Sequence, residues 1–292
     1  MKFFKYVFLV LLLLCLVCCA SYGQENNLQK IFQLKENEIG FSSLCSKNNL
    51  LLISYYNNDD NSGGLYWFQN NKIIKSLQNI KRGEISPDGS HYSYVLNKVI
   101  YINDNKDFNI IKVPTQGYLD RVVWAYDSKT IYFCEEGKTF NKVYSFNIAS
   151  KIKQEIISTK DQFFNPITVT NNRVIYLLQN IADESSPIPS CDIYQYDLMK
   201  KDFNKVLLPP IKNSTITYDF TVSPDEKIIM FSDISNKNIY VIDKNKVTII
   251  DKIKIPSDTL NKVVFSWKND SSYVIFTTTG KEIYKYIPPN LQ

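Results

Sequence analysis

The single histidine of the chain, His91, is the side chain best suited to general acid–base catalysis near neutral pH. A nucleophile–histidine–acid triad needs such an imidazole to take up and return a proton. His91 follows the polar turn Ser86–Gly89, where we expect a half-exposed surface residue at the start of a strand. The sequence also contains no G-x-S-x-G nucleophile elbow. We therefore expect neither triad chemistry nor a metal site built from histidine clusters.

Cysteine usage gives no sign of a disulfide framework or of a metal site. Three of the six cysteines fall within the N-terminal apolar run, and the other three are Cys45, Cys134 and Cys191. An odd number at such wide spacing matches neither pattern. One disulfide with one free thiol and three buried thiols are both compatible with the sequence, which leaves the pairing open.

Carboxylate chemistry is harder to dismiss, because paired acids can cleave glycosidic bonds. Most Asp and Glu residues occupy turns, where Asp is favoured for its bonds to the backbone. The acidic segment Asn57–Gly64 lacks the alternating ligands and the closing Glu of a calcium loop. We expect a solvated hairpin loop there, with a weak calcium site as the alternative. No resident metal or cofactor is predicted.

The N-terminus has the features of an export signal. Two lysines precede the uncharged run Tyr6–Ala20, and small residues follow it up to Gly23. Fifteen apolar residues fall short of the roughly 20 that span a bilayer. A cleaved signal peptide over residues 1–23 and an exported domain over residues 24–292 (periplasmic, cell-surface or secreted) are predicted. A membrane anchor and a lipoprotein modified at Cys18 or Cys19 are the alternatives.

A repeat of about 40 residues organises the remaining chain. Each of six copies has an apolar alternating run, a polar turn and a second apolar run. The polar turns are anchored at Lys47, Asp88, Asp127, Asn171, Asp225 and Asp270. Their intervals of 41, 39, 44, 54 and 45 residues match the period of β-propeller blades, with one insertion.

The runs within each copy predict antiparallel strands. They are rich in Ile, Val, Tyr and Phe, have a period of two, and are broken by Asn, Asp, Lys and Gly. Two further short runs follow each copy, which gives four strands per unit. The last unit has three runs, and residues 28–34 form an orphan run before the first unit. We expect residues 28–34 to complete the sixth blade and so close the ring without a free edge.

These units resemble the WD40-like (PD40) repeats of TolB-type six-bladed propellers. The segment Ile85–Gly89 with Tyr94, and Val222–Asp225 with Phe231, match the repeat's S-P-D-G turn and its following strand. The resemblance extends over essentially the whole mature chain. It implies an all-β fold, a six-bladed β-propeller of four-stranded antiparallel blades. The chain shows no TolB-type N-terminal domain and no hydrolase domain, so the partnerships of such proteins are not carried over.

The predicted function is a non-enzymatic binding module for an unknown protein or small ligand. The long loops fall between second and third strands and between blades, at one end of the propeller. There Tyr118, Phe163 and Phe164 are candidate anchors for a partner, and inward packing over the core is their alternative role. A carboxylate-using hydrolase or lyase with its site on the propeller axis is the alternative function.

Other classes of partner and modification have weaker support in the sequence. The formal net charge of +5 comes mostly from lysines scattered through turns beside acidic residues, which argues against a nucleic-acid stripe. No segment after residue 23 is long and apolar enough to span a membrane. Asn213 and Asn269 fit the N-glycosylation triplet, and such triplets arise by chance in an Asn-rich chain.

Overall fold

A computed structural model describes most of the chain after residue 26. The described residues are 27–35, 38–45, 50–57, 62–70, 72–80, 83–105, 109–117, 119, 122–138, 140–160, 164–171, 173–181, 190–211, 219–233, 236–254, 263–278 and 282–289. The predicted signal peptide, Tyr118, Phe163 and Asn213 lie outside them. Within them, no helix is long and apolar enough to cross a membrane.

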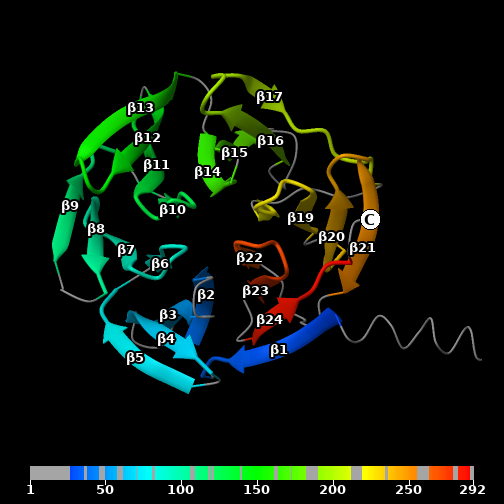
Figure 1. The fold of residues 1–292 in the computed structure, drawn as a ribbon, viewed down its shortest axis with the longest axis horizontal. Helices are drawn as coiled ribbons and strands as arrows, with labels where there is room; N and C mark the ends of the chain where they lie inside the picture. Colours follow the sequence, from blue (N-terminus) through cyan, green and yellow to red (C-terminus); the bar gives the residue numbers. More distant parts are fainter. Residues whose placement is uncertain are drawn as a thin grey trace, which may run out of the picture.

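Six four-stranded antiparallel sheets surround a central axis, as Figure 1 shows, so the predicted propeller is confirmed. Blade 1 contains β2 (Glu38–Cys45), β3 (Leu50–Asn57), β4 (Gly63–Gln69) and β5 (Lys72–Gln78). Blade 2 contains β6 (Gly83–Ile85), β7 (His91–Leu96), β8 (Val99–Asp104) and β9 (Ile110–Pro114). Blade 3 contains β10 (Val122–Trp124), β11 (Thr130–Glu136), β12 (Asn141–Asn147) and β13 (Ile152–Thr159).

The strands of each blade follow one another from the axis outwards, and blades 4 to 6 repeat the order of blades 1 to 3. Blade 4 contains β14 (Phe164–Val169), β15 (Val174–Ile181), β16 (Ser190–Asp197) and β17 (Phe203–Lys205). Blade 5 contains β18 (Phe220–Val222), β19 (Ile228–Asp233), β20 (Asn238–Asp243) and β21 (Thr248–Lys254). Blade 6 contains β22 (Val263–Trp267), β23 (Val274–Thr278), β24 (Glu282–Tyr286) and, as its outer strand, β1 (Leu28–Gln33).

The N-terminal strand closes the ring, as the orphan run of residues 28–34 predicts. β1 pairs antiparallel with β24, and its register places Leu28 opposite Tyr286. An ion pair of 2.9 Å between Lys30 Nζ and Glu282 Oε1 joins the same two strands. Both ends of the described chain therefore contribute to one blade (Figure 1).

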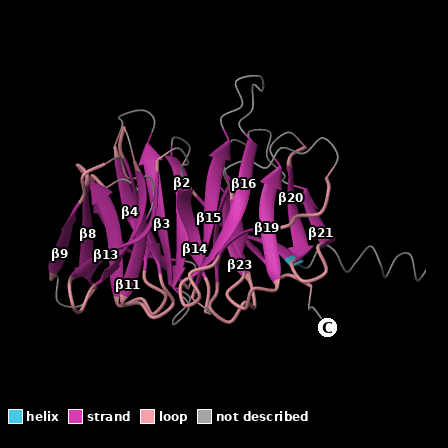
Figure 2. Cartoon of the chain, turned by 90° about the horizontal axis from the view of Figure 1, so that it is seen from above, coloured by secondary structure: helices cyan, strands magenta, loops and turns pink. Residues whose placement is uncertain are grey.

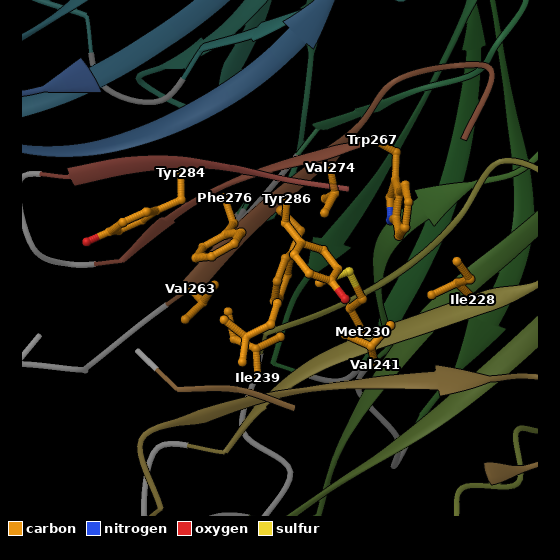
Figure 3. Packing of buried hydrophobic residues seen from close by; sticks show 12 residues of the cluster. Ile228, Met230, Ile239, Val241, Val263, Trp267, Val274, Phe276, Tyr284 and Tyr286 are labelled. Carbon is orange, nitrogen blue, oxygen red and sulfur yellow. The ribbon is translucent and has the colours of Figure 1, made fainter. Parts of the chain in front are cut away.

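The core lies between neighbouring blades, because the alternating strands turn one apolar face to each neighbour. Six buried clusters occupy the six junctions between blades. At the junction of blades 5 and 6, Met230 and Val241 pack with Val274 and Tyr286 (Figure 3). Each large side chain buried in this way contributes about 1.5–3 kcal/mol to stability.

The polar turn after each inner strand has a common backbone geometry in blades 2 to 6. Its fourth residue has a positive φ and donates its backbone N–H to the carbonyl of the first residue. These fourth residues are Gly89, Ser128, Arg173, Glu226 and Ser271. In blade 2, Ser86 Oγ donates to Asp88 Oδ1 over 2.8 Å, so the hydroxyl and carboxylate brace the turn.

The propeller has two distinct ends. In an antiparallel blade, the links between strands one and two and between strands three and four share one end. We call this end, which carries the five turns above, the turn face. Figure 2 shows many of the described loops along this edge of the upright strands. The opposite end carries the links between strands two and three and between blades, and we call it the long-loop face.

Candidate functional site

The propeller axis holds a narrow cavity of about 80 Å³ near the turn face. Residues of five inner strands line it, and the large ones are Trp124, Phe265 and Trp267. Glu84 is the one carboxylate among the lining residues that the structure describes. Cavities that hold small ligands are usually about 300–1,000 Å³, so this axial cavity is small for a substrate.

Phe164 does not occupy the exposed position that its role as an anchor requires. Its side chain is 1% exposed and packs edge-on against the rings of Tyr194 and Phe203, at 5.5 and 5.0 Å between ring centroids. Its N–H donates to Asn141 Oδ1 over 3.0 Å. The expectation of exposure is therefore wrong for Phe164, because the residue begins β14 and faces the junction between blades 3 and 4. Tyr118 and Phe163, outside the described residues, keep their predicted role as a hypothesis.

The structure also describes the environments of His91 and Cys134, which were considered from the sequence for catalysis and for disulfide pairing. His91 is partly buried as expected, its ring stacks on Trp124 at 6.1 Å, and Ser90 Oγ lies 2.7 Å from its Nδ1. Cys134 is a buried free thiol that accepts a hydrogen bond from Asn141 Nδ2. The side chains of Cys45 and Cys191 lie outside the description, so their pairing stays open.

Two further sites considered in the sequence are the N-glycosylation triplet at Asn269 and a metal site. Asn269 lines the axial cavity from the turn of blade 6. In the described part of the chain, no group of three or more His, Cys, Asp or Glu residues could hold a metal ion. The segment 58–61, in which a weak calcium site was the alternative, lies outside that part.

Hydrogen bonds join neighbouring turns on the turn face at three junctions. The backbone N–H of Asp88 in blade 2 donates to Ser128 Oγ of blade 3 over 3.0 Å. The N–H of Asp225 in blade 5 donates to Ser271 Oγ of blade 6 over 3.1 Å. Between blades 4 and 5, Thr170 Oγ1 donates to Glu226 Oε1 over 2.7 Å. In each case the fourth turn residue of the following blade supplies the accepting oxygen.

The junction between blades 3 and 4 departs from this pattern because its fourth turn residue is Arg173. Arg173 has the same backbone geometry, with a φ of 62° and its N–H 3.1 Å from the carbonyl oxygen of Thr170. Its guanidinium carries five donors and no acceptor, so it cannot complete the turn-to-turn bond. The N–H of Asp127, which corresponds to those of Asp88 and Asp225, has no acceptor among the described residues.

A groove of about 660 Å³ lies at this junction. It extends from Tyr126, which also lines the axial cavity, to Lys201 in the turn after β16. Tyr132, Tyr196, Leu198 and Met199 line it between these limits, with Met199 69% exposed. We call this the blade 3–4 groove. It falls within the range of volumes that ligand sites have.

The acidic side chains of the groove have partners within the chain, and its two basic side chains have no carboxylate partner among the described residues. Asp127 accepts bonds from the backbone N–H groups of Lys129 and Thr130, and Glu155 forms an ion pair of 2.7 Å with Lys142. Arg173 and Lys201 have no carboxylate partner among the described residues; Arg173 Nη1 lies 3.6 Å from Met199 Sδ. The cations are thus more available to a ligand than the carboxylates.

Two tyrosines of the groove, Tyr126 and Tyr132, stay neutral and able to donate. Burial and the Asp127 carboxylate raise the pKa of Tyr132 to about 12, against the opposing effect of Arg173. Burial and the Asp225 carboxylate likewise raise the pKa of Tyr126 above its ordinary value. Both phenols therefore remain protonated at physiological pH, where they offer an apolar ring with a polar tip.

Sequence reasoning missed this groove, although one signal was present. The aligned turns put Gly89, Ser128, Arg173, Glu226 and Ser271 at the fourth position, and Arg173 is the one among them whose side chain carries donors and no acceptor. The alignment predicts the turn. The consequence for the neighbouring blade depends on a contact between repeats, which a single repeat does not contain.

The fold and its axis define a six-bladed β-propeller. No protein-family model matches the sequence. No curated protein matches it either.

Solved structures match the fold. TolB from Acinetobacter baumannii is 14% identical, with 87% of this chain and 64% of that chain covered and a TM-score of 0.53. An oligogalacturonate lyase in complex with manganese is 14% identical, with coverage of 90% and 93% and a TM-score of 0.56. The Cps50 (Swd1) β-propeller domain of Myceliophteria thermophila is 9% identical, with coverage of 88% and 99% and a TM-score of 0.55. At these identities the likeness shows the fold alone, and it confirms the TolB-like and WD40-like propeller predicted from the repeats.

Proposed function

We propose that this chain is an exported, non-enzymatic propeller that binds a protein partner or a small ligand. The observation that carries the proposal is the lining of the axis. It is a cavity of about 80 Å³ with Glu84 as the one carboxylate among its described residues. A closed ring of six packed blades offers a rigid scaffold on which loops and turns present binding residues.

The competing function is a carboxylate-using hydrolase or lyase with its site on the axis. One structural neighbour is an oligogalacturonate lyase, which makes acidic polysaccharides a reasonable substrate to test. Paired-acid cleavage of a glycosidic bond needs two carboxyl groups at a defined separation. A single described acid, Glu84, in a cavity of about 80 Å³ favours binding over this chemistry.

The binding site predicted from the sequence is the long-loop face, with Tyr118 and Phe163 as anchors. The test is co-purification of partners with the mature chain, residues 24–292, followed by mass spectrometry. Alanine at both positions is expected to remove a partner and leave the melting temperature unchanged. Ile74→Ala is the matched control, because Ile74 is apolar and 58% exposed on β5, the outer strand of blade 1, and does not lie in a loop of the long-loop face.

An enzymatic role would give a different result. Turnover of oligogalacturonate or another acidic oligosaccharide, lost in Glu84→Gln, would contradict the proposal. A co-purified partner retained by the double alanine variant would leave the binding module intact and remove the long-loop face as its site. N-terminal sequencing of the protein from the exported fraction tests the cleavage predicted after Gly23 or Ala20.

A further inference from the structure

We propose that the blade 3–4 groove on the turn face binds an acidic peptide segment of a partner protein. Arg173 and Lys201 would pair with its carboxylates, and Tyr196 and Met199 would contact its apolar side chains. This surface lies at the opposite end of the propeller from the long-loop face. The inference therefore does not depend on where, or whether, the long-loop face binds.

The groove is a local opening between two well-joined blades. At the long-loop end of the junction, the N–H of Phe164 donates to Asn141 Oδ1 over 3.0 Å. Beneath the groove, Val143, Ile175 and Leu177 pack in one buried cluster and are each 0% exposed. The walls are thus fixed by the core, and a ligand would meet a preformed surface.

The charges select an anionic ligand. Asp127 and Glu155 already have partners within the chain, whereas Arg173 and Lys201 have no carboxylate partner among the described residues. A guanidinium binds a carboxylate through two parallel hydrogen bonds, which makes Arg173 the specific contact. Lys201 adds a second positive charge at the rim of the groove.

Apolar side chains lie directly beside these cations. Met199 Sδ is 3.6 Å from Arg173 Nη1, and the methionine side chain is 69% exposed. Methionine adapts its shape to different partners, and exposed apolar side chains that cluster in a groove are typical of interaction sites. A carboxylate next to an aliphatic or aromatic side chain, as in an acidic peptide, would satisfy both features.

The extent of the groove favours a peptide over a compact anion. Its lining runs from the inner turns of two blades to Gln154 and Ile156 on β13, the outer strand of blade 3, and to Lys201. A single small anion would use Arg173 and leave the rest of the lining unoccupied. An extended chain of a few residues would contact all of it.

The test is a selection of short random peptides displayed on phage against the mature protein. Enriched peptides are expected to contain Asp or Glu beside Leu, Ile, Phe or Met. Synthetic copies should lose about tenfold to a hundredfold in affinity for the Arg173→Ser variant, the loss expected for one charged hydrogen-bonded contact. Lys72→Ser, which removes an exposed lysine from the outer strand of blade 1, is the charge-matched control and should bind normally.

Arg173→Ser also excludes misfolding as the cause. Serine occupies the same turn position, with positive φ, at residues 128 and 271. The variant can therefore accept the N–H of Asp127 as those serines accept their partners, and its melting temperature should rise by roughly 2–4 °C. Loss of binding in a more stable protein would support the proposal.

Four results would overturn it. Enriched peptides without acidic residues would contradict the charge argument, and equal affinities for the wild type and Arg173→Ser would contradict the site. If free glutamate or citrate competes as effectively as the peptide itself, the groove is a site for small anions instead. Failure to enrich any peptide would also count against the proposal.

Discussion

Blades 5 and 6 meet at the turn face through a hydrogen bond, whereas blades 3 and 4 leave a groove there. Ser271 Oγ accepts the N–H of Asp225 over 3.1 Å at the closed junction. Arg173 holds the corresponding position at the open junction, with nearly the same φ, 62° against 60°. The backbone is therefore shared, and the side chain at one turn position distinguishes a sealed junction from a candidate binding groove.

The apolar cores of the two junctions are alike in spite of this difference. Phe276 between blades 5 and 6 and Phe164 between blades 3 and 4 are each 1% exposed within buried clusters. Stability thus resides in the packed faces of the blades. The turn face can vary from one junction to the next without opening the ring.

The largest effect is expected from removing the buried phenylalanine rings at these two junctions. Phe276→Ala and Phe164→Ala should each lower the free energy of unfolding by about 3–5 kcal/mol, because each leaves a cavity in a packed junction. Urea denaturation followed by tryptophan fluorescence measures both. Similar losses would show that the open junction is as well packed as the closed one.

The Phe164 variant also separates the two roles considered for this residue. A loss below about 1 kcal/mol would contradict its assignment to the core and restore a surface role. Leu207→Ala, at an exposed apolar position, is the control and should change stability by less than about 0.5 kcal/mol.

A smaller effect is expected at the turn position itself. Ser271→Ala removes the acceptor for the Asp225 N–H and should cost about 0.5–1.5 kcal/mol. Arg173→Ala removes no turn-to-turn bond and should change the free energy of unfolding by less than about 0.5 kcal/mol. Equal losses in the two variants would break the distinction between closed and open junctions.

The smallest effect is the pH dependence of the stability that Asp270, in the turn of blade 6, contributes at the closed junction. Partial burial of Asp270 opposes ionisation, but the hydrogen bonds from Ser272 and Lys268 prevail and lower its pKa from 3.8 to about 2. A lowered pKa in the folded state adds stability above the unfolded pKa, and this is lost as the pH falls from about 4 towards 2. The stability difference between wild type and Asp270→Asn should therefore narrow over that interval. A difference that stays constant would contradict the assignment.

The repeats predict the fold well because their information is local. The turn Ser86–Gly89 and the alternating strands around it identify a blade, and the orphan run 28–34 identifies the strand that completes the ring. Phe164 could not be placed in the same way, since its environment is set by Tyr194, Phe203 and Asn141.

The blade 3–4 groove illustrates the same limit. Arg173 is visible in the aligned turns, and its effect appears only when the preceding blade is set beside it. The chemistry of the axis also depends on which inner-strand residues converge there. Composition alone left a carboxylate-using active site on the axis possible. Among the described residues that line the axial cavity, Glu84 is the one carboxylate.

Amide hydrogen exchange at single-residue resolution tests most directly whether Arg173 keeps the junction open. The N–H groups of Asp88 and Asp225 have serine acceptors, and the N–H of Asp127 has none among the described residues. We expect Asp127 to exchange about tenfold faster than Asp88 and Asp225 in the wild type, and to become similarly protected in Arg173→Ser. An Asp127 amide as protected as Asp225 in the wild-type protein would contradict the account.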